Sequence, residues 1–486
     1  MKFFLLFTFF CSLAQANTLD KIRERGVLLW GADAAGAAPY LFPNPRDPNE
    51  LIGFEVELAH TFAKELGVAG KQVQINWESL IPSLQKKDFD LSLDGIEITP
   101  DRQKVVLFSR PFFVYTEQLV VRKDESHIKQ FEDLKGKKVG TLAASAAMEI
   151  LENLGGVHIQ VYESQVQPYD DLVLGRIDAV FLDLPIAEYF GRPNPKLKFL
   201  GEPIGEGYYG VAIRKEDVEL KMEIDRIIEK LLKNGTLQGI YEKWGIWNKS
   251  QEKLLQWDER TSITGLEQAH SEVPLSSFLP TLLRGARTTI FLSCASMGLA
   301  ILLGLFLTLI RLYGPRPLSD LSYLYIEIYR GTPILVQLFI LYYGLPNIGI
   351  TLSPIAASII GLGMNYAAYE AEAYRAGISA IPKGQLEAGS ALGMTRVHII
   401  SRILLPQAIR ISLPVVTNDF IALFKDSSIV SMVAMVELTK TYTILATTKM
   451  RFFELGLVTA FLYFAMSYPL SFLSRHLEKK MKRGFV

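Results

Sequence analysis

The sequence predicts a multidomain protein in which an α/β domain precedes an all-α membrane domain with five spans. Residues 17–270 alternate strand-like and helix-like segments, whereas repeated long apolar runs begin at about residue 277. A chain of 486 residues has room for two or three domains. Its 51 basic and 51 acidic residues give zero formal net charge, which argues against a nucleic-acid partner.

Residues 1–16 are predicted to be a signal peptide. Lys2 is followed by an apolar core and then by the small-residue cleavage sequence Ala14-Gln15-Ala16. The core is too short to cross a bilayer comfortably, which favours a cleaved signal over a membrane anchor. Cys294 is the single cysteine beyond this segment, so no disulfide is expected within the mature chain.

The α/β domain is predicted from local patterns. Apolar residues recur every four positions from Phe54 to Leu66, and Gly67 follows, which indicates a helix that ends at the glycine. A second helix is expected at 80–86, and strands are expected at 27–31, 73–77, 90–93, 138–140 and 178–182. In open α/β sheets, ligands bind beyond the carboxyl ends of the strands.

Five membrane spans fit the apolar runs, at 288–310, 326–345, 353–374, 408–435 and 454–474. Charged residues in or near them are expected to face the bundle interior or to lie at helix ends, because a carboxylate at mid-bilayer costs about 2.5–3.5 kcal/mol. They are Glu327, Glu370, Glu372, Asp419, Lys425 and Asp426, and for Glu370, Glu372 and Asp426 both locations remain open.

Lysine and arginine placement predicts the orientation. Basic residues follow the first span, fill the segment 375–407 and close the chain, whereas the loop 345–353 contains none. With five spans, the basic segments fall on one side, which is then cytoplasmic. The N-terminal domain is therefore expected outside, in agreement with a signal peptide.

A polar segment at about 383–410 separates apolar spans and carries a distinctive spacing. It comprises Glu387-Ala388-Gly389, then Gly393 after three residues, then Ile403 to Pro406 after nine more. This spacing resembles the EAA loop of ABC importer permeases, although Gly389 replaces the usual alanine. The small residues allow close approach of the backbone, Gly393 allows a sharp turn, and Pro406 is expected to restart a helix. The resemblance implies that these residues couple the chain to a separate ATPase.

The first half resembles the family 3 extracellular solute-binding proteins for polar amino acids. The resemblance rests on Gly53–Leu58, Leu80–Leu84, Asp94–Arg102, Phe108–Phe112 and Gly207–Ala212. It implies two lobes of an α/β periplasmic-binding-protein domain, joined by two strands and closing on the ligand.

Position by position, the resemblance also implies ligand-binding residues. Arg102 matches an arginine that holds the α-carboxylate, for which a planar guanidinium is well suited. Asp183 matches the acid that pairs with the α-ammonium, Trp77 an aromatic against the ligand side chain, and Asp33 an acid near the end of that side chain. The backbone around Gly95 would bind the carboxylate. The alternatives are a salt bridge of Arg102 with Asp101 or Glu97, core packing for Trp77, and a helix N-cap for Asp183.

Departures from the family pattern bear on the ligand. Glu97 replaces a hydroxyl near the carboxylate clamp, and the second-lobe turn, which ends at Ala146, lacks the usual glycine and a hydroxyl. A second aromatic expected near Gly36 is missing. With Asp33, Asp94 and Glu97 near the site, a cationic side chain such as that of lysine or arginine is favoured over glutamate.

The second half resembles the permeases of polar amino-acid uptake, through Tyr329–Pro333, Tyr369–Arg375, Ile381–Gln385 and Asn418–Ser428. Together the resemblances predict a signal peptide (1–16), a binding domain (17–248), a polar linker (249–275) and a permease domain (276–486). They imply a subunit of an ATP-driven importer in the bacterial inner membrane, with its binding domain in the periplasm. Its partners would be an ABC ATPase in two copies and a second permease, either another copy of this chain in a homodimer or a close paralogue. The chain itself is expected to be a transporter subunit and no enzyme, and to bind no cofactor or metal. ATP and Mg²⁺ would be used by the ATPase, since the chain has no G-x-x-x-x-G-K-[ST] sequence.

The alternative function is an amino-acid-gated ion channel or sensor with a binding-protein ectodomain. Such channels need a selectivity filter, and no TVGYG-like loop occurs in this chain. A cell-wall lytic enzyme on the same fold is disfavoured, because it would need a soluble catalytic domain with an active-site glutamate and the residues after 277 are expected to lie in the membrane. A dehydratase on this fold is disfavoured because Arg102 together with Asp183 argues for binding. No Ser/His/Asp or metal-binding pattern is found in the first half.

Overall fold

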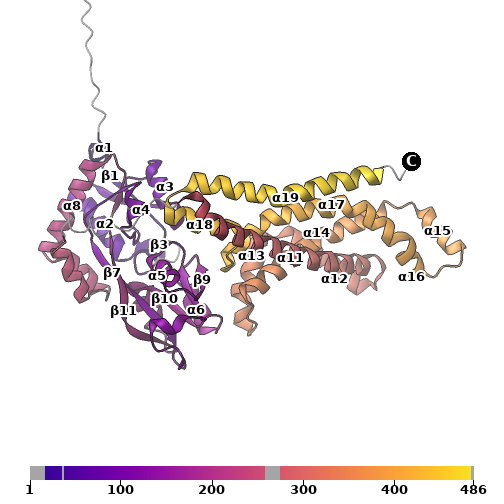
Figure 1. Cartoon of the computed structure of the whole chain (residues 1–486), viewed down its shortest axis with the longest axis horizontal. Coiled ribbons are helices and arrows are strands. Elements are labelled where there is room, and N and C mark those ends of the chain that lie inside the picture. The colour runs from indigo at the N-terminus through magenta and orange to yellow at the C-terminus, as the bar shows by residue number, and fades with distance from the viewer. Residues whose placement is uncertain (1–16, 35–37, 258–273, 483–486) are drawn as a thin grey trace, which may run out of the picture. The chain divides into compact units, whose positions relative to one another are not determined.

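The computed structural model describes residues 17–34, 38–257 and 274–482 (Figure 1). The predicted signal peptide and most of the predicted linker lie outside these ranges. The chain divides into two compact units, Met1–Gln118 with Leu182–Asn194 and Glu202–His270, and Leu119–Phe181 with Pro195–Gly201 and Ser271–Val486. The predicted domain boundaries stay predictions.

The first unit is built on a five-stranded sheet. Its strands follow the order β4 (Ala69–Gln74), β1 (Val27–Ala32), β5 (Leu91–Ser92), β12 (Ala212–Ile213) and β6 (Leu107–Phe108). β1 is parallel to β4 and β5, with Trp30 opposite Gln72 and Leu91. The remaining elements are α1 (Thr18–Arg25), the hairpin β2 (Phe42–Asn44) with β3 (Asp47–Ile52), α2 (Phe54–Leu66), α3 (Leu80–Gln85), α4 (Pro100–Gln103), α8 (Val218–Lys233) and α9 (Thr236–Lys243).

The predicted elements of this unit are largely confirmed. α2 buries its apolar face and ends at Gly67, whose φ of 75° is left-handed. The strand predicted at 73–77 is wrong, because β4 ends at Gln74 and Trp77 begins a short 3₁₀ turn. The Asp33 carboxylate accepts a hydrogen bond from the Trp77 N–H at 3.1 Å, and this bond holds the backbone away from the sheet.

A second five-stranded sheet has the order β11, β7, β10, β8, β9. Its strands are β7 (Phe113–Arg122), β8 (Lys138–Leu142), β9 (His158–Tyr162), β10 (Ala179–Asp183) and β11 (Leu197–Tyr209), with α5 (Ala146–Leu154), α6 (Gln167–Val173) and the short α7 (Leu184–Ile186) between them. β7 and β11 each contain residues of both units, as expected for two lobes joined by two strands. The fold is therefore a two-lobed α/β domain followed by a helical region.

The helical region holds α11 (Leu279–Tyr313), α12 (Arg316–Gly331), α13 (Ile334–Phe339), α14 (Pro354–Ser379), α15 (Lys383–Ala391), α16 (Arg396–Ile399), α17 (Leu405–Asp426), α18 (Leu438–Lys449) and α19 (Phe452–Lys482). Among the described residues, three helical stretches are long and apolar enough to cross a membrane, Leu275–Tyr313, Arg396–Val433 and Phe452–His476. A fourth is possible if Arg316–Gly331 and Ile334–Ile348, which are bent by 108°, form one span. The five-span count is not confirmed, because polar residues such as Asn365 and Glu370 make α14 less apolar than the expected span.

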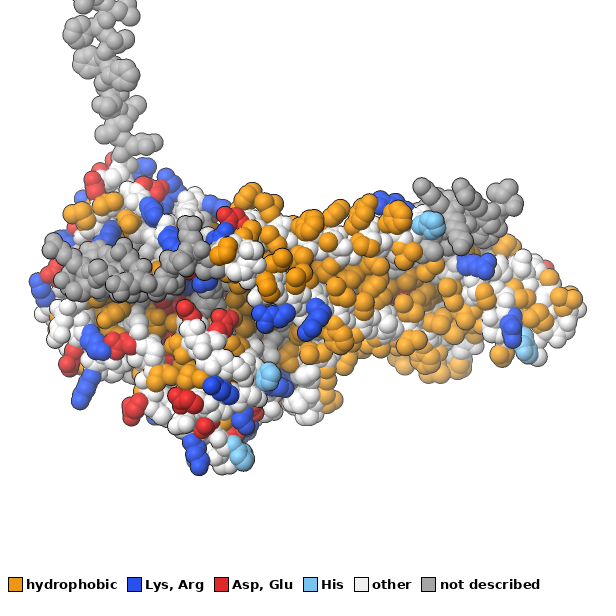
Figure 2. Space-filling model, viewed as in Figure 1, with side chains coloured by type: hydrophobic (Ala, Val, Ile, Leu, Met, Phe, Trp, Pro, Cys, Tyr) orange, Lys and Arg blue, Asp and Glu red, His pale blue; other side chains and the backbone are white. Residues whose placement is uncertain are grey.

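The surface of the helical region supports a membrane location. Figure 2 shows hydrophobic side chains over much of its visible face. Large apolar side chains of α11, α12 and α19 are exposed, among them Leu302, Phe306, Leu321, Phe453 and Phe461. An apolar surface of this extent is uncommon on soluble proteins and marks an interaction with lipid or another protein.

The structure also separates the acidic residues of these helices. The Glu370 side chain is buried in the bundle. Glu372 accepts a hydrogen bond from Arg375 at 2.8 Å and pairs with Arg311. Asp426 accepts a hydrogen bond from the Tyr366 hydroxyl at 2.7 Å. Glu370 therefore lies in the bundle interior, one of the two locations left open by the sequence, whereas Glu372 and Asp426 pair with polar side chains.

A glycine at the start of α2 can be tested. At Gly53, φ is 146°, and an added Cβ would lie 2.0 Å from the Tyr40 carbonyl oxygen. We expect Gly53→Ala to lower the free energy of unfolding of the binding region by about 2 kcal/mol or more, since both strain and a backbone clash oppose alanine. Gly67→Ala is the matched control, because Gly67 also has a positive φ but nothing within 4 Å of the added Cβ, and about 1 kcal/mol is expected.

Urea titration followed by tryptophan fluorescence provides the measurement. All five tryptophans precede residue 258, so their emission follows the binding region in the full chain. Equal urea midpoints for Gly53→Ala and Gly67→Ala would contradict the predicted backbone clash at Gly53.

Candidate functional site

Arg102 lies on the short helix α4, which Thr99 caps by accepting a hydrogen bond from the Arg102 N–H. The guanidinium is buried, donates to the Glu97 carbonyl oxygen at 3.0 Å and forms an ion pair with the Glu97 carboxylate. It also lies 5.5 Å from the centre of the Trp77 ring. The salt bridge to Glu97, weighed as the alternative role for Arg102, is therefore present, whereas Asp101 pairs with Lys104. The role of Arg102 as a carboxylate clamp stays a prediction.

Asp33, Trp77 and Asp94 are brought together after β1, β4 and β5. Besides its bond from the Trp77 N–H, Asp33 accepts one from the Gln74 side chain at 2.9 Å, and its own N–H donates to Asp94 at 2.9 Å. Trp77 is only half-buried, which disfavours core packing as its sole role. These contacts lie at the carboxyl ends of parallel strands, where ligands of α/β folds bind.

The predicted backbone donor at Gly95 already has a partner. Its N–H donates to Glu55 Oε1 at 2.8 Å, and its φ of 57° would strain any other residue. Burial raises the pKa of the Glu55 carboxyl well above its usual range, and the Asp94 carboxyl adds to this. Burial likewise raises the pKa of Asp94. Glu55 was not predicted as a site residue; the pattern that contains it reads as an ordinary helix start.

Asp183 ends β10 and lies among tyrosines. The Tyr40 hydroxyl donates to Asp183 at 3.1 Å and lies 2.9 Å from the Tyr209 hydroxyl. Burial, followed by the Glu97 carboxyl, raises the pKa of Asp183 to about 7, although hydrogen bonding by Glu117 and Tyr40 opposes the shift. Asp183 occupies the N-cap position of α7 without a capping hydrogen bond from its side chain. The capping alternative is thus disfavoured.

Two further residues complete this neighbourhood. Tyr115 stacks on Tyr209 with ring centres 4.8 Å apart, and Glu117 is fully buried on β7. Only an alternation of apolar and polar residues along β7 could have pointed to Glu117. Because that strand is buried on both faces, its residues show no such alternation. Ala146, the remaining predicted binding residue, is the first residue of α5 in the second unit, where Ser145 caps the helix.

The predicted coupling segment forms two helices around a turn. Glu387, Ala388 and Gly389 lie on α15, and Gly393 adopts a left-handed φ of 76° after that helix. Glu387, Ala388 and Gly393 are exposed. Gly389 is buried, and a Cβ there would lie 3.0 Å from the Ile403 side chain. Glycine, in place of the alanine usual at this position, therefore allows α15 to pack closely against Ile403.

Pro406 lies in the first turn of α17, as predicted, but α17 continues an earlier helix rather than beginning a separate one. The helix restarts at Arg396, where Thr395 accepts a hydrogen bond from the His398 N–H. It continues through a π-helical turn, Ile400–Leu404, into α17. Because proline lacks an N–H, the widened turn just before Pro406 accommodates it within a continuous helix.

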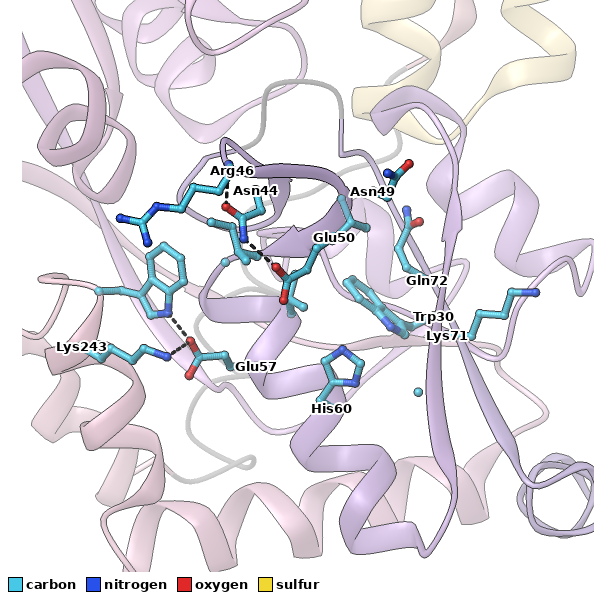
Figure 3. Close-up of a pocket in the computed structure, with 16 residues that line it drawn as sticks. Trp30, Asn44, Arg46, Asn49, Glu50, Glu57, His60, Lys71, Gln72 and Lys243 are labelled. Carbon is cyan, nitrogen blue, oxygen red and sulfur yellow. Dashed lines mark hydrogen bonds and ion pairs between the residues drawn. The ribbon is translucent and has the colours of Figure 1, made fainter.

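A separate cavity of about 1130 Å³ lies on the first unit between the β2–β3 hairpin, α2 and α9 (Figure 3). Its lining includes Trp30, Glu50, Glu57, His60 and Lys243, and Glu57 accepts hydrogen bonds from Lys243 and Trp244. None of the predicted ligand residues lines this cavity.

The two halves of the chain match two different families of known proteins. Residues 30–246 match bacterial extracellular solute-binding proteins, family 3, and residues 300–483 match the binding-protein-dependent transport system inner membrane component. The L-cystine-binding protein TcyJ of Escherichia coli strain K12 is 36% identical over 236 residues, which cover 48% of this chain and 88% of that protein.

The chain belongs to the family 3 solute-binding proteins and to the amino-acid ABC transporter permeases. The permease assignment is supported by the L-cystine transport system permease protein TcyB of Bacillus subtilis strain 168, which is 38% identical over 208 residues, 43% of this chain and 89% of that protein. A solved structure, holo ArgBP from T. maritima, is 35% identical with a TM-score of 0.42 and covers 46% of this chain and 98% of that one. Both family matches point to a transporter or binding protein.

The raised pKa of Glu55 gives a pH-dependent prediction for this binding–permease fusion. The folded chain holds the Glu55 proton to a higher pH than the unfolded chain does, so its free energy of unfolding falls as pH rises through that interval. Glu55→Gln removes the titration and keeps an oxygen for the Gly95 N–H. We expect it to stabilise the binding region at pH 8 by about 1 kcal/mol or more, since one pKa unit is worth about 1.4 kcal/mol.

At pH 4 the gain should shrink, because both states of the natural chain are then largely protonated. Urea midpoints at the two pH values measure the effect. Glu65→Gln, at a position that pairs with Lys230 on the surface, is the control and should show no such gain. A loss of stability at pH 8 for Glu55→Gln would show that the buried group is ionised.

Proposed function

We propose that this chain is the substrate-binding and membrane-spanning subunit of an ATP-driven importer for polar amino acids. The observation that carries the proposal is the union, in one polypeptide, of a solute-binding region at 30–246 and a permease region at 300–483. The first captures the amino acid outside the cell, and the second moves it inward.

In the proposed binding mode, the α-ammonium group pairs with Asp183 and the α-carboxylate with Arg102. Glu97 then exchanges part of its pairing with Arg102 for contact with the ligand. Trp77 packs against the ligand side chain, and Asp33 and Asp94 lie near the end of that side chain. The backbone at Gly95 lies near the α-carboxylate of the ligand. Ala146 faces the ligand from the second lobe. The buried arginine supports this mode, because its planar donors fit a carboxylate.

The ligand proposed is an amino acid with two cationic nitrogens. The relatives TcyJ and TcyB are named for L-cystine, and a putative arginine-binding protein of Escherichia coli is 32% identical over 202 residues. L-Cystine, L-arginine and L-lysine all carry a second ammonium or guanidinium group. The excess of carboxyls over arginine around Asp183 supports this class.

The proposed assembly spans the bacterial inner membrane. The binding region lies in the periplasm, and the basic segment 375–407 and the C-terminus face the cytoplasm. Two permease copies, each with five spans, would bind two ABC ATPase subunits, which use ATP and Mg²⁺. The exposed side chains of Leu392 and Val397 beside Gly393 support a docking surface there for the ATPase.

The direct test is uptake of labelled amino acids by vesicles that contain this chain and its co-purified ATPase. L-Arginine, L-lysine, L-cystine, L-glutamine and L-glutamate form the panel. ATP-dependent accumulation of at least one of them supports an importer. Ion currents on amino-acid addition, without ATP, would instead support the channel alternative.

The coupling segment gives a sharper prediction. Glu387→Arg and Gly393→Arg should abolish ATP-driven uptake, because a long charged side chain obstructs a surface built of small residues. Binding of the labelled amino acid by the same purified chain should be unchanged. Gly384→Ala, at an exposed position with free space around it, is the control and should transport normally. Normal uptake by both arginine variants would remove the coupling assignment.

The pKa of Asp183 predicts how binding depends on pH. Only the ionised carboxylate attracts an ammonium group, so affinity should fall by up to about tenfold per unit as pH drops below about 7. Asp183→Asn should weaken binding at pH 8 by roughly 30-fold or more, because it unpairs a buried cation. Equilibrium dialysis between pH 5 and 9 measures both effects, and a pH-independent affinity in the natural chain would contradict the role of Asp183.

A further inference from the structure

Glu117 is a buried carboxyl that the proposed binding mode does not use. It lies on β7, one of the two strands that contain residues of both units, and its side chain has no exposed surface. Neither of its carboxyl oxygens accepts a hydrogen bond from a donor among the described residues. An unpaired buried carboxyl is costly, so a group in this position requires a specific explanation.

The surroundings of Glu117 are acidic. The charged groups that act on it, within the described residues, are the carboxyls of Asp183 and Glu97. Asp183 ends β10, the strand beside β7 in the sheet. Tyr40 and Tyr115 are the titratable hydroxyls that sense its charge. The nearest guanidinium of the site, Arg102, is already paired with Glu97.

These surroundings favour a neutral Glu117. Burial and two neighbouring carboxyls raise the pKa of Glu117 well above its usual range. Two carboxyls in contact within a buried site cannot both ionise cheaply, so such a pair holds one proton. The proton belongs on the more buried member, because Asp183 retains some exposure and has a donor in Tyr40.

We propose that Glu117 holds a proton and donates it in a hydrogen bond to the Asp183 carboxylate, which keeps Asp183 ionised and aimed at a cationic group of the ligand. Glu117 is thus a positioning residue that acts through Asp183. The inference rests on the proposed function only in assigning the ammonium to Asp183. With donors from both Tyr40 and Glu117, the carboxylate is fixed from two sides before the ligand arrives.

If Glu117 acts as a hydrogen-bond donor, two substitutions at this position should differ in ligand binding, whereas a purely structural role predicts no such difference. Glu117→Gln keeps a neutral donor of the same shape, whereas Glu117→Met keeps the volume and removes the donor. We expect Glu117→Gln to bind the amino acids of the uptake panel within about threefold of the natural chain. Glu117→Met should bind about tenfold more weakly at pH 7, because a hydrogen bond to a charged group is lost.

The pH profile provides the second readout. Without its donor, the Asp183 carboxylate is less stable, so the midpoint of the affinity profile should move to higher pH in Glu117→Met and stay in place in Glu117→Gln. Equilibrium dialysis of the full chain between pH 5 and 9 measures this. Glu57→Gln, which removes a carboxylate that pairs with Lys243, is the control and should leave the profile unchanged.

A third measurement needs no ligand. At pH 8 the infrared spectrum of the full chain should contain a protonated-carboxyl band that is weakened in Glu117→Gln and unchanged in Glu57→Gln, because Glu55 and Asp94 also contribute to it. If no amino acid of the panel binds the natural chain, the proposed function fails while this band still tests the proton on Glu117. The proposal is overturned if the band is unaffected, if Glu117→Gln binds as weakly as Glu117→Met, or if both variants bind as the natural chain does.

Discussion

The exclusion of carboxyl groups from water is the constraint on which the ligand region depends. Glu55, Asp94, Glu97, Glu117 and Asp183 are all buried in one unit. Burying a charge without a partner is prohibitive, so each group needs a donor, a cation or a proton. Glu97 has Arg102, Glu55 has the Gly95 N–H, Asp94 has the Asp33 N–H and Asp183 has Tyr40. The loops after β1 and β5 are fixed by these bonds.

In the helical region, close packing takes the place of such polar bonds. An added Cβ at Gly304 would lie 2.7 Å from the Glu370 Cβ, and one at Gly363 would lie 2.7 Å from Leu299. α11 and α14 therefore approach through glycines. In a bilayer, where lipid is as apolar as leucine, small residues of this kind favour helix association through close backbone contact. The buried Glu370 is enclosed by the same contact.

Much of this architecture could be predicted from sequence, because local signals and tertiary structure agree. The period of α2 and the glycine after it fixed both ends of that helix, and the apolar runs located α11 and α19. Trp77 was placed in a strand because its β-propensity is high, whereas a distant carboxylate, Asp33, decides its conformation. Pro406 was expected to begin a helix, but the preceding π turn lets the helix continue through it.

The site itself was predictable only in part. The family resemblance implied a carboxylate clamp at Arg102, and that role stays a prediction. The structure shows Arg102 buried and paired with Glu97, the salt bridge that was weighed as its alternative. Whether the partner is Asp101 or Glu97 depends on a turn that the sequence alone does not define. Glu55 and Glu117 escaped notice, because an acidic residue in a helix start or a strand is usually solvent-exposed. Only the packing of elements far apart in sequence makes these two positions interior.

Joining receptor and translocator in one polypeptide has a kinetic consequence. The ratio between them is set at one to one by translation, so a cell cannot make extra solute-binding region without also making permease, as it could with separate genes. In return, covalent attachment keeps the receptor beside the permease at an effective concentration on the order of millimolar. An encounter between the two regions therefore needs less intrinsic affinity than one between separate proteins.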